Sequence, residues 1–270
     1  MPELPEVETT RRGIAPHITG KTVTGVTVRN RSLRQPITKG LGRQLKGKTV
    51  RAVKRRAKYL LLETDTGTLL LHLGMSGSLR ILPPGTPAGV HDHFDLEFAD
   101  CCLRLRDPRR FGLVLWTREP VAEHSLISRL GPEPLSDAFT GDTLQQLAAK
   151  RRIPVKNLIM DGKVVVGVGN IYASESLFLS GIHPRRPCNR IALTRYRKLA
   201  DNIKQVLAAA IAQGGTTLRD FQQENGKPGY FAQKLKVYGR EGKPCPNCGS
   251  PIKQVRIGQR SSFYCGRCQR

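Results

Sequence analysis

The sequence has few acidic residues for its number of basic ones. It contains 21 Asp and Glu against 45 Lys and Arg, which gives a formal net charge of +24. A strongly basic chain has a polyanionic partner more often than not, namely DNA, RNA or the ribosome. The alternative is a solvated basic surface with no specific partner. The charge therefore predicts nucleic-acid binding, but it indicates no particular chemistry.

Long hydrophobic runs are missing. The uncharged apolar stretches, such as residues 59–62 and 69–71, are short, whereas a membrane-spanning helix needs about 20 apolar residues. Glu3 and Glu6 stand where a secretory signal peptide would carry basic residues. We therefore expect a cytoplasmic protein without a membrane span.

The chain also lacks the regular cysteine framework of a small secreted domain. Three of its seven cysteines are scattered, and the other four close the sequence in a regular spacing. In an intracellular chain this usage indicates a metal site and ordinary buried thiols rather than disulfides. The scattered cysteines are Cys101, Cys102 and Cys188, and the spaced ones are Cys245, Cys248, Cys265 and Cys268.

The spacing C-x2-C-x16-C-x2-C predicts one tetrahedral Zn²⁺ held by four thiolates. Such a site leaves no coordination position for substrate or water, so we expect a structural rather than a catalytic zinc. A tail this short has too little core to fold without metal. Its basic residues favour a DNA-contacting hairpin, and the alternative is an element that only completes the fold.

The N-terminal part combines one helix with many short strands. Apolar residues at helical offsets predict a helix over residues 5–18. After it, alternating patterns such as Phe94, Leu96 and Phe98 against Asp95 and Glu97 predict strands with one polar face. Many short strands up to residue 116 favour a β-sandwich. Further strands are expected at residues 23–28, 58–64, 68–73 and 79–82.

The second part of the sequence is predominantly helical. Helices are predicted over residues 144–150, 155–160, 171–180 and 194–213, and Gly214-Gly215 ends the last of them. Residues 222–230 are polar and turn-rich, which predicts a loop. The fold class is therefore multidomain α+β. We predict a β-sandwich domain over residues 1–130, a helical domain over 131–240 and a zinc ribbon over 241–270.

The N-terminus carries a chemically unusual feature. Removal of Met1 would leave Pro2 as a free secondary amine, which can attack an aldehyde-level carbon and form an iminium ion. Glu3 and Glu6 lie beside it as candidate acids. The alternative is that Pro2 simply begins a helix. This chemistry requires the removal of Met1.

Six motifs in order along the chain resemble the formamidopyrimidine-DNA glycosylase family. The zinc ribbon, with Gln259-Arg260 before its third cysteine, completes the resemblance. The start, Pro-Glu-Leu-Pro, differs from the Pro-Glu-Gly-Pro typical of the sister enzyme endonuclease VIII, which favours oxidised purines over oxidised pyrimidines as substrates. The motifs occupy residues 1–9, 55–60, 72–77, 107–112, 166–173 and 226–231.

The resemblance implies a base-excision repair enzyme that removes 8-oxoguanine and formamidopyrimidines and then cleaves the strand by β,δ-elimination. Pro2 would be the nucleophile that forms the Schiff base, and Glu3 would protonate the sugar ring oxygen. Lys58 would donate a proton and contact phosphate. Arg260 would clamp phosphates at the lesion and assist δ-elimination, first as a fixed charge because a guanidinium stays protonated.

The resemblance also implies a set of DNA contacts. A glycosylase extrudes its target base, and Met75, Arg109 and Phe111 would fill the space that this base leaves. Without the resemblance, Met75 and Phe111 would be read as core residues. His91, Arg151 and Asn170 would contact DNA, with Asn170 in a helix–two-turn–helix motif and Arg151 where relatives carry lysine. Residues 222–230 would form a lid over the extruded base.

Two other functions stay open from the residues alone. A non-catalytic zinc-ribbon protein that binds nucleic acid would show the same charge and cysteines, and a related glycosylase could act on oxidised pyrimidines. The resemblance implies a monomer whose partner is double-stranded DNA with oxidised purines or abasic sites. We expect it in the bacterial cytoplasm, associated with the nucleoid when bound to DNA.

Overall fold

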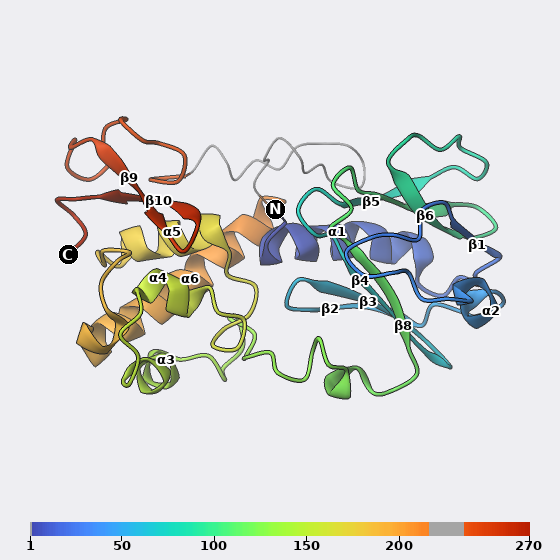
Figure 1. Cartoon of the computed structure of the whole chain (residues 1–270), viewed down its shortest axis with the longest axis horizontal. Coiled ribbons are helices and arrows are strands. Elements are labelled where there is room, and N and C mark those ends of the chain that lie inside the picture. The colour runs from blue at the N-terminus through green and yellow to red at the C-terminus, as the bar shows by residue number, and fades with distance from the viewer. Residues whose placement is uncertain (1, 216–234) are drawn as a thin grey trace. The chain divides into compact units, whose positions relative to one another are not determined.

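The computed structural model describes residues 2–215 and 235–270 (Figure 1). These residues divide into two compact units. The first contains residues 2–128 and 213–215, and the second contains residues 129–212 and 235–270. The helical region and the ribbon thus share one unit, and the division into three domains at 130 and 240 stays a prediction.

The first helix, α1 (Leu4–Ile18), begins with a reciprocal cap. Glu3 is the N-cap residue, and its backbone N–H donates to Oε2 of Glu6 at 2.9 Å. This arrangement satisfies amide groups that the first turn of a helix leaves without partners. Ile14 and Ile18 are buried in the core on the same side of the helix. The predicted N-terminal helix is confirmed, and it starts one residue earlier than expected.

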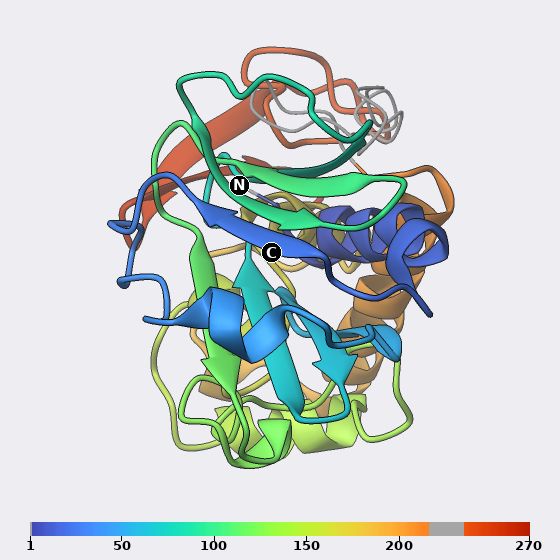
Figure 2. The ribbon, with the colours of Figure 1, turned by 90° about the vertical axis from the view of Figure 1, so that its right-hand side faces the viewer.

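Two antiparallel four-stranded sheets contain the strands of the first unit (Figure 2). Their strand orders are β1-β6-β7-β5 and β2-β3-β4-β8. Leucines of β3 and β4, Phe94 of β6 and Ile14 of α1 belong to one buried cluster, so both sheets and the helix share a core. This confirms the β-sandwich. The strands are β1 (Gly25–Val28), β2 (Ala52–Arg56), β3 (Tyr59–Thr64), β4 (Gly67–His72), β5 (Ser78–Leu82), β6 (Asp92–Glu97), β7 (Cys102–Arg106) and β8 (Leu113–Thr117).

The polar side of the first sheet departs from the expected solvated face. Asp95 and Arg104 are only 2% and 4% exposed. The Arg104 guanidinium donates to both Asp95 oxygens, at 2.9 and 2.8 Å, and to the carbonyls of Thr86 and Pro87. Arg29 donates to Asp95 at 2.6 Å. The alternating pattern of apolar and polar residues therefore predicted these strands correctly. On this sheet, however, the polar face carries a buried ion pair instead of side chains that are exposed to solvent.

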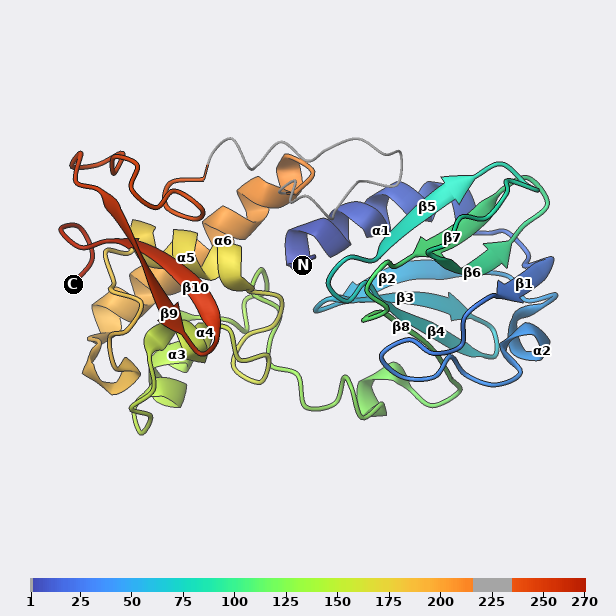
Figure 3. The ribbon, with the colours of Figure 1, turned by 45° about the horizontal axis from the view of Figure 1, so that its top comes forward.

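The second unit contains four helices and a two-stranded ribbon (Figure 3). The predicted helices are confirmed with shifts of a few residues at their ends. Gly214 and Gly215 have positive φ angles of 72° and 80°, as expected for residues that follow a helix. The elements are α3 (Gly141–Ala148), α4 (Val155–Ile159), α5 (Asn170–Leu179), α6 (Leu193–Ala212), β9 (Ile252–Ile257) and β10 (Arg260–Cys265).

Three short elements were not predicted. They are α2 (Leu41–Leu45) and the 3-10 turns η1 (Val121–Glu123) and η2 (Cys188–Arg190). In the described ranges, no helix has both the length and the apolar character that crossing a membrane requires.

Candidate active site, DNA-contacting loops and zinc centre

The predicted nucleophile and acid lie at the start of α1. Pro2 is buried, and Glu3 is 2% exposed. Because Glu3 is the N-cap, its carboxylate lies where backbone N–H groups and the positive end of the helix dipole favour negative charge. Glu3 thus caps the helix and is also the residue that is expected to act as the acid. Met1 lies outside the described residues.

Lys58 lies in the tight turn of the β2–β3 hairpin. Arg56 pairs with Tyr59, which leaves Ala57 and Lys58 as the turn residues. Ala57 has a φ of 55°, a left-handed conformation that costs about 1 kcal/mol for a residue with a side chain. Arg55 donates to the Ala57 carbonyl at 3.0 Å and so helps to hold the turn.

The same arginine connects this hairpin to α1. Arg55 Nε donates to Glu8 Oε2 at 3.0 Å, and Arg11 and Arg12 also donate to the Glu8 carboxylate. Burial raises the pKa of Glu8, but these three guanidinium groups outweigh it and lower the pKa to about 2. A charged Glu8 thus links the helix that begins at Pro2 to the turn that carries Lys58.

His72 at the end of β4 is a neutral neighbour of this turn. Its Nδ1 accepts a hydrogen bond from the Gly74 amide at 2.9 Å, and its ring lies 4.9 Å from that of Tyr59. Burial lowers the pKa of His72 to about 4, and the charges of Lys58 and Arg34 add to this effect. The site therefore combines fixed positive charge with an imidazole that is uncharged at neutral pH.

Two loops of the sandwich carry the residues expected to fill the space of an extruded base. Met75 lies between β4 and β5, and Arg109 and Phe111 lie between β7 and β8. Phe111 is 43% exposed, so it is not the core residue that its apolar character alone would predict. The Arg109 guanidinium carbon lies 5.3 Å from the centre of the Phe111 ring. His91 lies just before β6 and is half-buried.

In the second unit, a hydrogen-bond network brings Asn170 close to the ribbon residue Arg260. Asn170, the first residue of α5, donates from Nδ2 to the Ser261 carbonyl at 2.9 Å. The ammonium group of Lys156 donates to Asn170 Oδ1 at 2.6 Å and to Ser262 Oγ at 2.7 Å. Arg260 directly precedes these serines at the start of β10.

Arg151 is not part of this network. Its guanidinium pairs with Asp161 at 3.5 Å, and both side chains are more than one third exposed. Its backbone carbonyl accepts hydrogen bonds from Asn189 and from the Cys188 thiol. The remaining predicted element, the lid over residues 222–230, lies outside the described residues.

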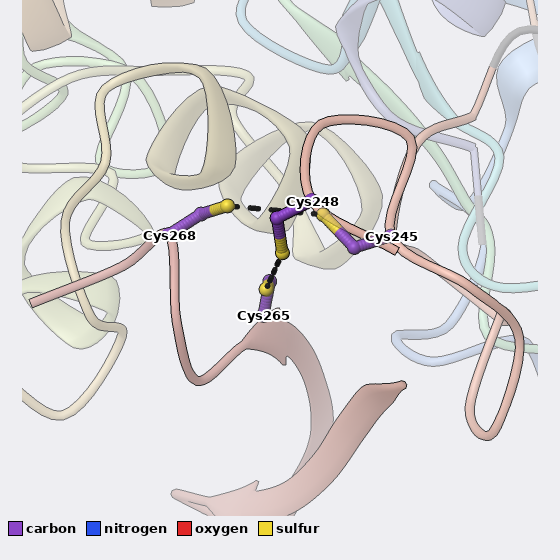
Figure 4. A group of neighbouring side chains, drawn as sticks. All are labelled: Cys245, Cys248, Cys265 and Cys268. Atoms are coloured by element: carbon purple, nitrogen blue, oxygen red, sulfur yellow. Dashed lines mark hydrogen bonds between the residues drawn. The ribbon is translucent and has the colours of Figure 1, made fainter. Parts of the chain in front are cut away.

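The four spaced cysteines converge in the ribbon (Figure 4). All four sulfur atoms lie within 4.8 Å of one another; the Cys245–Cys268 distance is 3.9 Å and the Cys248–Cys265 distance is 3.5 Å. Tetrahedral Zn²⁺ with Zn–S bonds of about 2.3 Å places its sulfur ligands about 3.8 Å apart. The four sulfur atoms are thus close enough to one another to hold one zinc ion. Cys101, Cys102 and Cys188 are buried free thiols, as predicted.

Several buried polar residues around these sites were missed. Lys156 is 1% exposed, and Asp107 is completely buried. In the sequence, Lys156 is one of 45 basic residues and carries no distinguishing signal. Asp107 falls within the motif at residues 107–112, but its polar partners are set by the fold and not by local spacing.

Sequence models of known families match three parts of the chain. Residues 1–114 match the formamidopyrimidine-DNA glycosylase N-terminal domain, residues 130–222 match the H2TH domain of the same enzymes, and residues 242–270 match a zinc finger found in FPG and IleRS. The zinc-finger match agrees with the four-sulfur cluster, and the ribbon is a zinc site for one ion.

Whole-chain relatives agree with these matches. The formamidopyrimidine-DNA glycosylases of Methylococcus capsulatus and Alkalilimnicola ehrlichii are 60% and 61% identical, and each alignment covers 100% of both chains. Among solved structures, MutM (Fpg) from Thermus thermophilus is 36% identical with a TM-score of 0.90, covering 99% of this chain and 98% of that one. A Lactococcus lactis Fpg mutant in complex with DNA containing Fapy-dG is 32% identical with a TM-score of 0.93, covering 99% of each chain. The chain belongs to the formamidopyrimidine-DNA glycosylase family.

Proposed function

We propose that Pro2 is the nucleophile with which this DNA glycosylase and AP lyase excises oxidised purines from duplex DNA. The main support is the arrangement at the start of α1. A buried Pro2 precedes a capping Glu3, and the Glu8–Arg55 ion pair links this helix to the Lys58 turn. Fixed positions for nucleophile and acid are what a covalent mechanism requires.

The reaction proceeds in two stages. Once Met1 has been removed, the Pro2 nitrogen attacks C1′ with its lone pair, and the glycosidic bond breaks. The base leaves with the electrons of that bond and takes up the proton that the attacking amine loses. Glu3 protonates the ring oxygen O4′ as the sugar opens, which leaves an iminium ion between Pro2 and C1′. The iminium accepts electrons when a C2′ proton is lost, so the bond to the 3′ phosphate breaks. In the second elimination the C4′ proton is lost to solvent, and its electrons break the bond between C5′ and the 5′ phosphate.

Charged and polar residues of both units would contact the phosphates of the DNA. We assign Lys58 as a proton donor and phosphate contact, and Arg260 as a phosphate clamp in the δ-elimination. Asn170, held by Lys156 beside the ribbon, would bind the backbone next to Arg260. Arg151 would supply a further contact, for which it would have to leave Asp161.

Two loops of the sandwich would replace the extruded base. Met75 would occupy its place in the stack, Phe111 would wedge between neighbouring bases, and Arg109 would hydrogen-bond the orphaned cytosine. The exposure of Phe111 and its contact with the Arg109 guanidinium support this assignment. His91 would contact the backbone. We also propose a monomer that acts in the bacterial cytoplasm, associated with the nucleoid when bound to DNA.

Borohydride trapping tests this function. The protein is incubated with a duplex that carries one 8-oxoguanine opposite C, and borohydride reduces any iminium to a stable covalent adduct. We expect a protein–DNA band whose link maps to residue 2, and its loss in Pro2→Gly. Lys58→Ala should slow strand cleavage, whereas Lys54→Ala, a control at an exposed lysine of β2 that pairs with Glu63, should not.

Two results would contradict the proposal. Tight binding without adduct or cleavage would leave a zinc protein that only binds DNA. An adduct formed faster on oxidised pyrimidines than on 8-oxoguanine would assign the chain the specificity of the sister enzyme.

A further inference from the structure

Asp107 connects the loops that carry the four proposed DNA contacts of the sandwich unit. It is completely buried and lies at the end of β7, directly before the loop with Arg109 and Phe111. Its side chain accepts two hydrogen bonds, from Ser76 Oγ at 2.9 Å and from the Gly112 amide at 2.7 Å. One carboxylate therefore connects the loop between β4 and β5 to the loop between β7 and β8.

Ser76 completes this connection from the other side. Its hydroxyl donates to Asp107 Oδ1 and accepts from the Arg109 amide at 3.2 Å. Ser76 directly follows Met75 and is only 6% exposed. Ser76 thus holds the backbones of both loops, next to Met75 in one loop and at Arg109 in the other.

The backbone of Asp107 extends the network to the third loop. Its N–H donates to the His91 carbonyl at 2.9 Å, and its carbonyl lies 2.9 Å from His93 Nε2. Because His93 is buried on β6, the position of His91 is tied to the same aspartate.

The backbones of the two loops also pack directly against each other, so that no side chain would fit at Gly74. Gly74 has a φ of 61°, and a Cβ atom there would lie 2.4 Å from the Phe111 carbonyl carbon. The backbone of the Met75 loop is therefore packed directly on the backbone of Phe111, and the hydrogen bonds of Asp107 hold this packing in one register.

We propose that Ser76 and Asp107 are positioning residues that hold Met75, Arg109 and Phe111 as one preformed unit for insertion into the DNA stack. Neither residue needs to touch DNA. Their hydrogen bonds form in the DNA-free protein. DNA binding therefore does not have to supply the free energy that is needed to order the two loops. The proposal rests on the function assigned above to those three residues.

Ser76→Ala is the direct test, with Ser78→Ala as its matched control. Both serines are 6% exposed, and Ser78 lies on the neighbouring strand β5. Each variant is assayed for excision of 8-oxoguanine opposite C and opposite A in duplex DNA. Each is also assayed for borohydride trapping on a single-stranded oligonucleotide with an abasic site, where no stacked space has to be filled.

We expect Ser76→Ala to slow duplex excision about tenfold, since the lost hydroxyl leaves buried polar groups without a partner. The preference for C over A opposite the lesion should fall, because Arg109 is no longer fixed. Single-stranded trapping should change by less than about twofold, and Ser78→Ala should resemble the unchanged protein in every assay. Ser76→Thr, which keeps the hydroxyl, should restore most of the duplex activity.

A second variant and a measurement of stability distinguish a positioning role from a loss of folding. Asp107→Asn keeps the shape but presents an N–H₂ group to one of its two donors, and thermal melting identifies variants that remain folded. For a folded variant, equal losses on duplex and single-stranded substrates would mean a general structural role and would overturn the proposal. Unchanged duplex excision in Ser76→Ala would also overturn it. Failure of the unchanged protein to trap on the abasic oligonucleotide would instead contradict the Pro2 mechanism.

Discussion

His72 makes stability sensitive to mild acid. Its pKa is lowered to about 4 in the folded chain by burial and by the charges of Lys58 and Arg34, against an ordinary value of 6.5. The folded state therefore holds the imidazole neutral, and this contribution to stability is complete above pH 6.5 and is lost as the pH falls towards 4. We expect an NMR titration of the DNA-free protein to give a pKa near 4 for His72.

The same argument predicts the behaviour of a His72 variant. Asn at this position keeps an acceptor for the Gly74 amide but does not titrate in this range. The free energy of unfolding of His72→Asn should depend less steeply on pH between 6.5 and 4 than that of the unchanged protein. Parallel curves would show that His72 is not the responsible group.

We expect Glu8 to contribute more to the free energy of unfolding than a carboxylate with a single partner would. Its carboxylate receives Arg11, Arg12 and Arg55, and its lowered pKa of about 2 means that this stabilisation is present above pH 4.5 and lost as the pH falls towards 2. Glu8→Gln should lower the free energy of unfolding by about 1–3 kcal/mol, because three guanidinium groups lose a charged acceptor. Denaturant unfolding measures this change.

A matched control is the ion pair between Arg51 and Asp65. Both of these side chains are more than half exposed, at 60% and 51%. Asp65→Asn should not change stability measurably, because surface pairs of this kind contribute little. Equal effects of Glu8→Gln and Asp65→Asn would contradict the link between α1 and the Lys58 hairpin.

A residue could be assigned from the sequence only where a spacing or a local motif marks it. Cysteine spacing predicted the metal site, and the roles proposed for Pro2, Glu3 and Lys58 come from the family motifs along the chain and stay predictions. Ser76, Asp107 and Lys156 were missed because their importance lies in partners far away in the sequence. Ser76 and Asp107, for example, are 31 positions apart.

Helix α5 is joined to the segment before the ribbon through one buried carboxylate. Glu175 is 3% exposed and accepts hydrogen bonds from the amides of Lys236, Val237 and Tyr238 at 2.8–3.0 Å. Glu175→Gln should destabilise the protein by about 1–3 kcal/mol, because one oxygen becomes an N–H₂ group that faces a backbone donor. Thermal unfolding checks the size of the effect.

Lys204 on helix α6 makes a simpler contact: among the residues that the structure describes, its ammonium group donates to one carbonyl, that of Ser136, at 3.1 Å. Lys204→Met is therefore a suitable control for Glu175→Gln. If both variants melt at the temperature of the unchanged protein, the carboxylate does not anchor the segment.

Elements were predictable where a pattern repeats over enough residues. The stripe of apolar residues in α6 and the alternation in β6 and β7 fixed both the type and the approximate ends of these elements. Helix α2 has only five residues, which is too short for a periodic signal. The buried Asp95–Arg104 pair was missed because alternation shows which side chains share a face but not what covers that face.

Zinc should hold together the ribbon rather than the sandwich. Chelation should remove one zinc ion per chain and make four thiols reactive, those of Cys245, Cys248, Cys265 and Cys268. Cys101, Cys102 and Cys188 should stay unreactive because they are buried, and burial raises the pKa of Cys102 to about 12. Thiol titration with and without chelator, together with metal analysis, measures both quantities.

DNA binding should fall with the loss of zinc, because Arg260 and the serines that join it to Asn170 lie on the ribbon. Cys101→Ala serves as the control, since this cysteine belongs to the core of the sandwich. Reaction of Cys101 and Cys102 together with the four ribbon thiols on chelation would contradict the expectation that the sandwich keeps its fold without zinc.

The two units were visible in the sequence as a change from strands to helices near residue 130, and the structure divides there as well. The sequence could not show that residues 213–215 return to the first unit, because three residues carry no pattern of their own. Nor could it show that the ribbon and the helices share one compact unit, which depends on contacts such as those of Lys156 and Glu175.

The order of the zinc ligands along the chain has a consequence for how the protein is made. All eight strands of the sandwich have been translated once Thr117 has left the ribosome, so its two sheets can fold while synthesis continues. Cys265 and Cys268 are translated long afterwards, and the metal cannot have four ligands until they appear. A nascent chain would therefore carry the loops of Met75, Arg109 and Phe111 before its zinc ligands are complete, and the phosphate contact proposed for Arg260 would form only after the ribbon has bound its metal.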